Sequence, residues 1–495
     1  MEIKAGKHRL FTICIVLLLF IGTFVVAVET GLAATTSDYT YSLNGGVATI
    51  TGYTGVGGAI SIPATLDGHT VVAIGNSAFM GNINICSVFI PSGITSIGRY
   101  AFESCTLMTS VIIGNGVTTI QMRAFYGCTS LTSVTIPDGV TTIEGLAFAS
   151  CKSMTAFNVG AGNLNYASVD GVLYDKAITI LIHCPAGKGG AVNVPNTVTQ
   201  IWNYAFYACS YLTAINIVAS NPNYASIEGV LYDKTVTELI RYPGGKAGSF
   251  IVPDSVTSIG IYAFFSSPAI TSITISNNVK TVGAVAFGDC PALTSVIIGS
   301  GVTTIDTAAF YDCSSLSSMT IPSSVTSIYY NAFNNCSSMT AFNVASDNPD
   351  YASVDGVLYD KSLITLLQYP GARVGAFAVP SSVTIINYQS FYHCYGLTAV
   401  TMPDSVVTIK TSAFERCGNL TEVTMGNGVT SIWSYAFSRC LSLSSVILSN
   451  NLTEIHSDAF SNCPSLATIT LPDSMTTIWG RAFHSCTALT SFTIP

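Results

Sequence analysis

The chain has 495 residues, of which 49% are apolar and only 9% are charged, so it can bury a large core with far fewer charges than a typical soluble domain. The formal net charge is −8, and the 18 lysines and arginines form no basic cluster after the N-terminus. Phosphate binding requires concentrated basic side chains, so this composition argues against a nucleic-acid-binding protein.

Residues 1–34 are predicted to be an export signal. Lys4, Lys7 and Arg9 precede the apolar run 11–28, and small residues at 31–33 offer a cleavage site. The run of 18 residues is close to the lower limit for a membrane span, so a retained anchor is the alternative to cleavage. We therefore expect an extracellular or cell-surface protein whose only membrane contact is through this segment.

Residues 35–59 differ from the sequence that follows. Tyr39, Tyr41 and Leu43 alternate with polar residues, and the turn at 44–46 contains two glycines before a second alternating run. This pattern is typical of a β-hairpin. We interpret it as an N-terminal cap over the first repeat.

From residue 60 the chain repeats itself. The clearest marker is a phenylalanine that follows alanine in every copy except one, where Ser390 precedes it. Ten of the 13 intervals between these anchor phenylalanines are 23 residues, and the other three are 58, which is one unit plus an insert of 35. The anchors are Phe79, Phe102, Phe125, Phe148, Phe206, Phe264, Phe287, Phe310, Phe333, Phe391, Phe414, Phe437, Phe460 and Phe483.

Each unit carries two extended segments. In one copy, Val134 and Ile136 alternate with polar residues and Pro137 ends the run, which indicates a strand with one buried face. The segment 140–143 is shorter and β-branched, and the unit has no room for a long helix. One unit cannot close a core, whereas stacked units form continuous buried columns. The sequence therefore predicts a mainly β solenoid of about 14 repeats of 23 residues.

The full motif is Ile-Pro-x-x-Val-Thr-x-Ile-x-x-x-Ala-Phe-x-x-Cys-x-x-Leu-Thr-x-Val. It closely resembles the BspA-type leucine-rich repeat, over residues 60–495. The resemblance implies a leucine-rich-repeat solenoid and a secreted or surface location, and several members of that family act as adhesins. It carries over no fixed catalytic or binding residue.

Twelve cysteines share one slot, three residues after the anchor phenylalanine. We expect them to be reduced thiols in an inward column, where a small apolar side chain with a weak donor fits a turn. The chain has no Cys-x-x-Cys pair, so we expect no zinc, and we predict no other metal or cofactor. These cysteines are Cys105, Cys128, Cys151, Cys209, Cys290, Cys313, Cys336, Cys394, Cys417, Cys440, Cys463 and Cys486.

Three inserts lie near 158–195, 216–253 and 343–380. They share the sequence YASVDGVLYDK or YASIEGVLYDK, and the Asp-Gly pairs at 170–171 and 355–356 favour a hairpin turn. We predict β-hairpins added to a coil. His183, Arg241 and Gln368 occupy one equivalent slot, which we expect to be variable and exposed.

We predict that the protein is not an enzyme and has no catalytic residues. Its six histidines do not cluster, and its acidic residues are dispersed. The remote alternative is a polysaccharide-active β-solenoid enzyme. Such an enzyme would need charged residues gathered over several coils. Asp306 and Asp312 come nearest to that arrangement, and we expect both carboxylates to be solvated.

Two surfaces vary between copies and could bind a partner. The outward face of the longer strand is small, nearly neutral and without the aromatic or arginine anchors that recognition usually needs. The three residues before Ala-Phe are richer in aromatic side chains, which suit stacking on sugars or anchoring of a protein. The alternative is that these rings pack over the neighbouring coil. The candidate binding residues are Trp202, Trp433, Trp479 and Tyr329 at the first position, Tyr330 and Tyr388 at the second, and Tyr204 and Tyr435 at the third.

Our leading functional hypothesis is an extracellular protein that binds another protein or a glycan, as an adhesin does. The alternative is a structural, self-associating component of the cell envelope or matrix. The neutral strand face favours this alternative, as does the sequence end halfway through a unit, which would leave an open edge for self-association.

Overall fold

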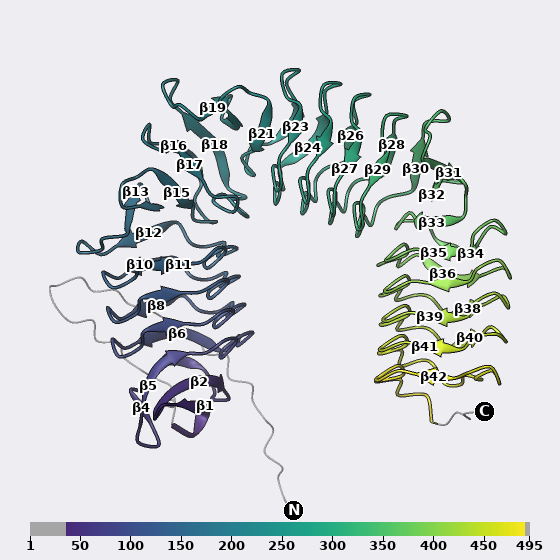
Figure 1. Cartoon of the computed structure of the whole chain (residues 1–495), viewed down its shortest axis with the longest axis horizontal. Helices are drawn as coiled ribbons and strands as arrows, with labels where there is room; N and C mark the ends of the chain where they lie inside the picture. Colours follow the sequence, from purple (N-terminus) through teal and green to yellow (C-terminus); the bar gives the residue numbers. More distant parts are fainter. Residues whose placement is uncertain (1–35, 491–495) are drawn as a thin grey trace, which may run out of the picture. The chain divides into compact units, whose positions relative to one another are not determined.

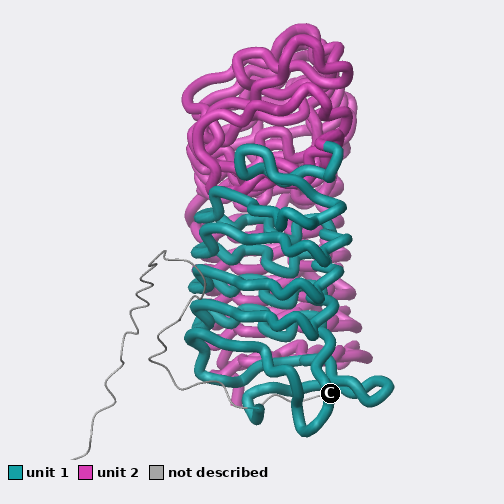
Figure 2. The backbone as a smooth tube through the Cα atoms, turned by 90° about the vertical axis from the view of Figure 1, so that its left-hand side faces the viewer, with its two compact units in different colours: residues 1–177 teal, residues 178–495 magenta. Residues whose placement is uncertain are grey.

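The computed structural model describes residues 36–490, in two compact units that comprise residues 1–177 and 178–495 (Figure 2). The predicted export signal and the last five residues lie outside the described range. Within it, the chain is mainly β and contains no α-helix. Each unit is a β-solenoid in which successive coils lie side by side (Figure 1). The predicted leucine-rich-repeat solenoid is confirmed.

In the first unit, a 3₁₀ turn, η1 (Thr36–Asp38), precedes two sets of strands and one hairpin. The first set is one sheet, in which two-residue strands pair with a few longer ones. Its strands are β1 (Tyr39–Asn44), β2 (Val47–Tyr53), β4 (Thr65–Leu66), β5 (His69–Ile74), β7 (Ser96–Ile97), β9 (Thr119–Ile120) and β11 (Thr142–Ile143). The long strands are β3 (Gly58–Ser61), β6 (Ile85–Ile90), β8 (Ser110–Ile113), β10 (Ser133–Ile136) and β12 (Ala156–Val159). The hairpin consists of β13 (Tyr166–Val169) and β14 (Val172–Asp175).

The second unit repeats this arrangement. Its short strands are β15 (Ile180–His183), β17 (Gln200–Ile201), β21 (Glu238–Arg241), β23 (Ser258–Ile259), β25 (Thr281–Val282), β27 (Thr304–Ile305), β29 (Ser327–Ile328), β33 (Thr365–Gln368), β35 (Ile385–Ile386), β37 (Thr408–Ile409), β39 (Ser431–Ile432), β41 (Glu454–Ile455) and β42 (Thr477–Ile478). Its long strands are β16 (Gly190–Val194), β18 (Leu212–Ile217), β22 (Gly248–Ile251), β24 (Ile270–Thr274), β26 (Ser295–Ile297), β28 (Ser318–Ile321), β30 (Ala341–Val344), β34 (Gly375–Ala378), β36 (Leu397–Thr401), β38 (Glu422–Thr424) and β40 (Ser445–Ile447). Its hairpins are β19 (Tyr224–Ile227) with β20 (Val230–Asp233), and β31 (Tyr351–Val354) with β32 (Val357–Asp360).

The long strands follow the alternation in the sequence. In β10, Val134 and Ile136 are buried while the residues before each of them are exposed. The strand pairs with β12 in parallel and without a shift, so that Val134 lies opposite Phe157. Pro137 then accepts a hydrogen bond from the N–H of Val140 at 3.2 Å, which forms the turn into the next short strand. Period-two alternation thus places one side chain of each pair in the core.

The anchor phenylalanines form a stacked column in the core of each unit. Phe102 and Phe125 are fully buried, with ring centroids 5.2 Å apart and planes that differ by 5°. In ten coils the N–H of the anchor donates to the alanine carbonyl of the next coil, as from Phe125 to Ala147 at 2.8 Å. A small side chain is needed before the anchor, because the adjacent coil lies directly against this backbone.

The inserts contain more than the predicted hairpins. In the second insert, β21 pairs in parallel with β23 and β22 pairs in parallel with β24, so the segment completes a further, shorter turn. The ring of Tyr242 stacks on Phe264 at 4.9 Å, and in the third insert Tyr369 stacks on Phe391 at 4.8 Å. Tyrosine thus takes the place of the anchor phenylalanine. The prediction of 14 repeats was too low, because the solenoid has about 19 turns.

A tyrosine hydroxyl closes the sheet edge before each hairpin. Three sheets of short strands end at β11, β17 and β29. The N–H of the last isoleucine in each strand donates to the hydroxyl of the tyrosine that begins the following hairpin, at 2.8–2.9 Å. The pairs are Ile143 with Tyr166, Ile201 with Tyr224, and Ile328 with Tyr351. Each hydroxyl supplies the acceptor that the next strand would otherwise provide.

A buried asparagine holds the turn in front of each of these tyrosines. Asn348 is fully buried; its Nδ2 donates to the carbonyls of Pro322 and Val325 at 2.8 and 2.9 Å. Its Oδ1 accepts from the N–H groups of Asp350 and Tyr351 at 2.9 and 2.8 Å. Asn163 and Asn221 occupy the same place in the other two inserts. The hairpin is therefore tied to the preceding coil by side-chain hydrogen bonds.

The residue two places before the anchor adopts a left-handed backbone in most coils, whatever its type. Its φ is 59° at Tyr262, 53° at Val285 and 58° at Tyr435. A left-handed backbone costs a non-glycine residue about 1–2 kcal/mol, and a β-branched residue is the least suited to it. The turn geometry of the coil therefore overrides the local preference of the sequence.

Replacing Val285 by asparagine is expected to raise the free energy of unfolding by about 1 kcal/mol, because asparagine tolerates a left-handed backbone better than valine. Urea unfolding followed by circular dichroism measures the change. Arg439, with a φ of 60°, provides the opposite test, since Arg439→Val should lower the stability. An unchanged stability in Val285→Asn would contradict the strain argument.

Candidate binding site

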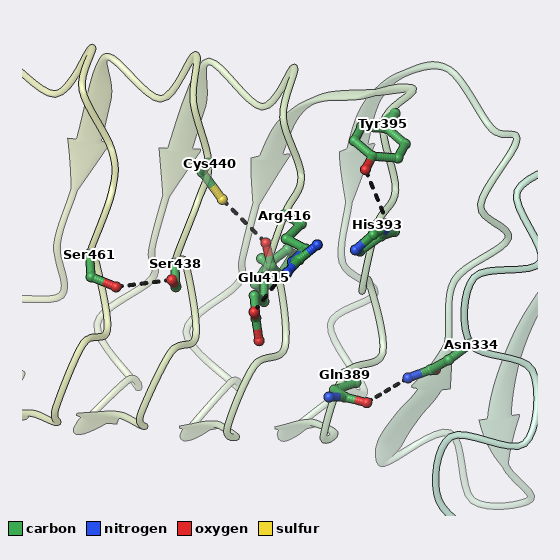
Figure 3. Close-up of polar contacts among 10 residues, drawn as sticks. Asn334, Gln389, His393, Tyr395, Glu415, Arg416, Ser438, Cys440 and Ser461 are labelled. Atoms are coloured by element: carbon green, nitrogen blue, oxygen red, sulfur yellow. Dashed lines mark hydrogen bonds and ion pairs between the residues drawn. The ribbon is translucent and has the colours of Figure 1, made fainter. Parts of the chain in front are cut away.

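The twelve cysteines of the repeated slot form a buried column, as predicted. In ten of them the Sγ lies 3.0–3.2 Å from the carbonyl oxygen of the anchor phenylalanine one unit earlier, and the thiol donates to it. Figure 3 shows this bond from Cys440 to Phe414. Burial raises the pKa of the Cys105, Cys336 and Cys417 thiols to about 12. These thiols are therefore neutral packing groups.

Cys105, Cys336 and Cys417 are expected to resist alkylation by iodoacetamide at pH 8 in the native protein. The thiolate is the reactive form, and a pKa raised to about 12 leaves only about 1 thiol in 10,000 ionised at that pH. Cys86, which is partly exposed and lies outside the column, is expected to react before these three. Mass spectrometry with and without urea measures both classes. Rapid native labelling of Cys417 would contradict the buried-column assignment.

The last five short strands place one side chain from each coil in a straight row. Strands β35, β37, β39, β41 and β42 pair in parallel, with Ile386, Ile409, Ile432, Ile455 and Ile478 opposite one another. The residue after each isoleucine therefore stands at one edge of the solenoid. In chain order these residues are Asn387, Lys410, Trp433, His456 and Trp479.

The rings along this row lie against one another. Trp433 and His456 have centroids 5.7 Å apart and planes that differ by 28°, and His456 and Trp479 are 5.8 Å apart with planes that differ by 13°. The Tyr388 ring is nearly perpendicular to the Trp433 ring, with centroids 6.4 Å apart, and the Nζ of Lys410 lies 4.8 Å from the centre of the Tyr388 ring. We call Tyr388, Lys410, Trp433, His456 and Trp479 the aromatic column.

Polar side chains flank the aromatic column. The Nε2 of His456 lies 3.3 Å from Glu454, and the Nε of Arg481 lies 3.5 Å from Asp458. The Nε1 of Trp433 donates to Ser431 at 3.2 Å. Trp479 and Tyr388 remain 50% and 42% exposed. The column therefore offers apolar ring surface bordered by hydrogen-bonding groups, which is typical of a binding surface.

Sequence reasoning missed His456 as part of this surface. The six histidines do not cluster in the sequence, whereas His456 lies between two tryptophans in the structure because it occupies their slot in the coil between them. The repeat itself could have identified His456, since it lies 23 residues after Trp433 and 23 residues before Trp479.

The other predicted residues lie elsewhere. Trp202 follows β17, which belongs to a different sheet from β39 and β42. Tyr204 packs 5.7 Å from Tyr262 in a group of rings that also contains Tyr207 and Phe265. Tyr329 and Tyr330 follow β29 and are 51% and 66% exposed, and Tyr435 is 43% exposed. Among the predicted residues, Tyr388, Trp433 and Trp479 are thus brought together.

A second polar group lies near the third insert (Figure 3). The Nδ2 of Asn334 donates to Gln389 at 2.6 Å, and Tyr395 and His393 form a hydrogen bond of 3.2 Å. Burial, aided by the charge of Arg416, lowers the pKa of His393 to about 4, so this imidazole is neutral at physiological pH. The adjoining cavity has a volume of about 10 Å³, close to the size of one water molecule. It is too small for a substrate.

Asp312 lies in the same region and is partly buried, whereas we predicted a solvated carboxylate. Burial raises the pKa of Asp312, against the opposing hydrogen bond from Asn335. The slot of His183, Arg241 and Gln368 also differs from its prediction. His183 and Arg241 are buried, because the extra turn of each insert directs this side chain inward, and Arg241 donates to the carbonyls of Tyr262 and Phe265.

The long-strand face carries an aromatic residue that the sequence interpretation overlooked. Phe89 is 46% exposed and lies opposite Ile112, which is 54% exposed. A shallow hollow of about 280 Å³ adjoins Ile112, Thr135 and Asp138 in the first unit. This face is therefore less uniform than predicted.

Over residues 36–490, no group of three or more histidine, cysteine, aspartate or glutamate side chains is placed to hold a metal ion. The same range contains no helix with the length and apolarity that a membrane span requires.

The repeat is matched by the family model for the BspA type leucine-rich repeat region, in six copies over residues 60–169, 190–243, 240–352 and 370–495. The chain belongs to this family. A comparison with curated proteins finds no match.

Among solved structures, the chain is similar to a leucine-rich cell surface protein from Faecalibacterium prausnitzii, with 26% identity over 94% of this chain and 95% of that one and a TM-score of 0.48. It is also similar to a leucine-rich repeat protein from Eubacterium ventriosum, with 24% identity, coverage of 91% and 93%, and a TM-score of 0.33. The pneumococcal vaccine antigen PcpA is 16% identical, with coverage of 85% and 100% and a TM-score of 0.42.

Proposed function

We propose that this BspA-type protein is a non-catalytic, secreted or cell-surface binding protein of the adhesion type. It engages an extracellular protein or glycan through the aromatic column. The observation that carries the proposal is the alignment of Trp433, His456 and Trp479 at 5.7–5.8 Å intervals on one edge. Family membership and the predicted export signal support the location.

The aromatic column suits a binding role because aromatic side chains present large contact surfaces at low entropic cost and are enriched among residues that dominate binding energy. Stacking between neighbouring coils holds these rings in place before a partner arrives, which lowers the cost of ordering them. The remaining exposed area of Trp479 and Tyr388 is available for contact.

Replacing both Trp433 and Trp479 by alanine is expected to weaken binding to the physiological partner by about 100-fold, since each anchor contributes about 1.4 kcal/mol or more. A screen of the purified chain against immobilised glycans and extracellular-matrix proteins identifies the partner, and biolayer interferometry measures the loss. Tyr329→Ala combined with Tyr330→Ala is the matched control, because these exposed rings follow an equivalent short strand in another sheet.

A self-associating structural role is the second candidate. Phe89 and Ile112 favour it, because they expose apolar area on an otherwise neutral strand face. Sedimentation of the purified chain over a range of concentrations separates the two roles. Oligomers that form without any partner, together with an empty binding screen, would support the structural role and reject the binding role.

A further inference from the structure

The second and third inserts interrupt the second unit, and the coils on either side of each insert meet in a seam. The second seam joins the coil of Phe206 to the coil of Phe264, and the third seam joins the coil of Phe333 to the coil of Phe391. The sheets of short strands end at β17 and β29, and those of long strands end at β18 and β30. Contacts across each seam therefore come from the insert and from side chains.

The backbone contacts of the two seams are equivalent. Two hydrogen bonds of 2.7–2.9 Å tie each insert to the coils beside it. They run from Gly245 to Leu212 and from Tyr242 to Ala263 at the second seam, and from Ala372 to Met339 and from Tyr369 to Ser390 at the third. A difference in strength between the seams must therefore come mainly from side chains.

Aromatic rings close the second seam. Tyr204 and Tyr207 belong to the coil before the insert, and Tyr262 and Phe265 belong to the coil after it. The ring centroids are 5.7 Å apart for Tyr204 and Tyr262, and 4.5 Å apart for Tyr207 and Phe265. The buried Arg241 of the insert also donates to the carbonyls of Tyr262 and Phe265. Aromatic pairs of this kind stabilise a contact beyond the apolar area that they bury.

Side-chain amides occupy the equivalent positions at the third seam. Asn331 and Asn334 precede the insert, and Gln389 and Tyr392 follow it at the same spacing of 58 residues. The Nδ2 of Asn334 donates to Gln389 at 2.6 Å and to Asn331 at 3.1 Å (Figure 3). Gln368 stands in the slot of the buried arginine. Hydrogen bonds between amides thus take the place of the ring contacts.

The third seam also contains several buried polar atoms that lack a partner. Among residues 36–490, the Oδ1 of Asn334, the Oγ of Ser390 and the Nε2 of His393 have no hydrogen-bond partner, and Asn334 and Ser390 are 1% and 0% exposed. In the described part of the second seam, the Oγ of Ser267 is in this state. The cavity of about 10 Å³ is lined from both sides of the third seam. Unpaired buried groups and missing contacts both weaken the closed arrangement.

We propose that the third seam is a hinge, at which the second unit opens locally while the coils on both sides stay folded and the second seam stays closed. When the third seam opens, its amides and unpaired groups exchange protein contacts for water. Separation of the rings of the second seam instead exposes apolar surface to water. Opening is therefore less costly at the third seam. It moves the coils that end at β30 relative to those that follow from β35, as hinges at a few element ends do.

Hydrogen–deuterium exchange of the native full chain tests the hinge. After correction for intrinsic rates, segment 369–372 is expected to be at least about tenfold less protected than the equivalent segment 242–245, because local opening frees its amides. Strands β27 and β37, on either side of the third seam, are expected to stay protected. Equal protection at the two seams, or exchange of β27 and β37 together with the third seam, would overturn the inference.

A graft of the rings of the second seam tests the cause. Asn331→Tyr, combined with Asn334→Tyr and Gln389→Tyr, gives the third seam tyrosine at all four positions. The protection of segment 369–372 is expected to rise about tenfold, which is the effect of about two additional aromatic pairs. Tyrosine suits the backbone at Asn331 and Gln389, because Tyr262 adopts the same left-handed conformation, with a φ of 59°.

The reciprocal variant provides a test even if the graft does not fold. Tyr204→Asn, combined with Tyr207→Asn and Tyr262→Gln, is expected to lower the protection of segment 242–245 about tenfold and to leave segment 369–372 unchanged. Asn343→Ala, at an exposed position beside the third insert, is the control and should change neither segment. Circular dichroism establishes that each variant is folded. If a folded variant leaves the protection of its own seam unchanged, the inference fails.

Discussion

Replacing Phe310 by alanine is expected to lower the free energy of unfolding by about 4 kcal/mol. The Phe310 side chain is fully buried, and its ring lies 5.0 Å from Phe287 and 5.7 Å from Phe333, with interplanar angles of 3° and 8°. Alanine removes the apolar contact on both sides at once and leaves a cavity that two rigid neighbouring coils cannot close. The loss is therefore expected to lie well within the range for a buried aromatic residue, which is about 3–5 kcal/mol.

Urea unfolding measures the change, and hydrogen exchange locates it. Because coils of a solenoid interact mainly with their neighbours, exchange should accelerate most in the coils next to Phe310. Tyr330→Ala is the control, since this ring is 66% exposed and its removal should change the stability by less than about 0.5 kcal/mol. A loss below about 1 kcal/mol in Phe310→Ala would show that the stacked anchor phenylalanines do not contribute substantially to the stability of the core.

Replacing Asn348 by alanine is expected to cost about 3 kcal/mol. The substitution removes four hydrogen bonds and leaves the carbonyls of Pro322 and Val325 and the N–H groups of Asp350 and Tyr351 without their side-chain partner. Buried polar groups that lose a partner cost more than the net value of the bond. The Tyr351 hydroxyl should also shift, because the turn that Asn348 holds places it under β29.

Asn343→Ala is the matched control, since this asparagine is exposed in β30 of the same insert. Asn348→Asp separates the two halves of the site: it retains the acceptor for Asp350 and Tyr351 but places a carboxylate against two carbonyls. It should therefore be destabilising near neutral pH. If Asn348→Ala and Asn343→Ala are equally stable in urea unfolding, the hydrogen bonds of Asn348 do not stabilise the insert.

The regular repeats could be predicted because successive coils pair with one another in the same register. Once the anchor phenylalanine repeats every 23 residues, stacking places Val134, Phe157 and their equivalents in the same column without further information. The extra turns of the second and third inserts were not predicted, because Tyr242 and Tyr369 stand there in place of the anchor phenylalanine. The stacked column of the core therefore requires a ring of this size at the anchor position, and either phenylalanine or tyrosine can supply it.

The aromatic column was only partly predictable for a related reason. Trp433 and Trp479 were singled out by residue type, and their shared slot fixed their alignment. His456 required attention to the slot between them. The left-handed residues before the anchor could not be predicted at all, since Val285, Tyr262 and Leu146 share no local preference for that conformation. Contacts between coils impose it.

The uniform register between coils has a consequence for how such a gene can change. Loss or duplication of one complete unit would leave every buried column continuous, because any regular coil can pack on any other. The hairpins are less free, since Asn348 and Tyr351 bond to residues of the coil before them and must be exchanged together with it. Recombination within the last coils would lengthen or shorten the row of rings by whole steps while the fold stays the same.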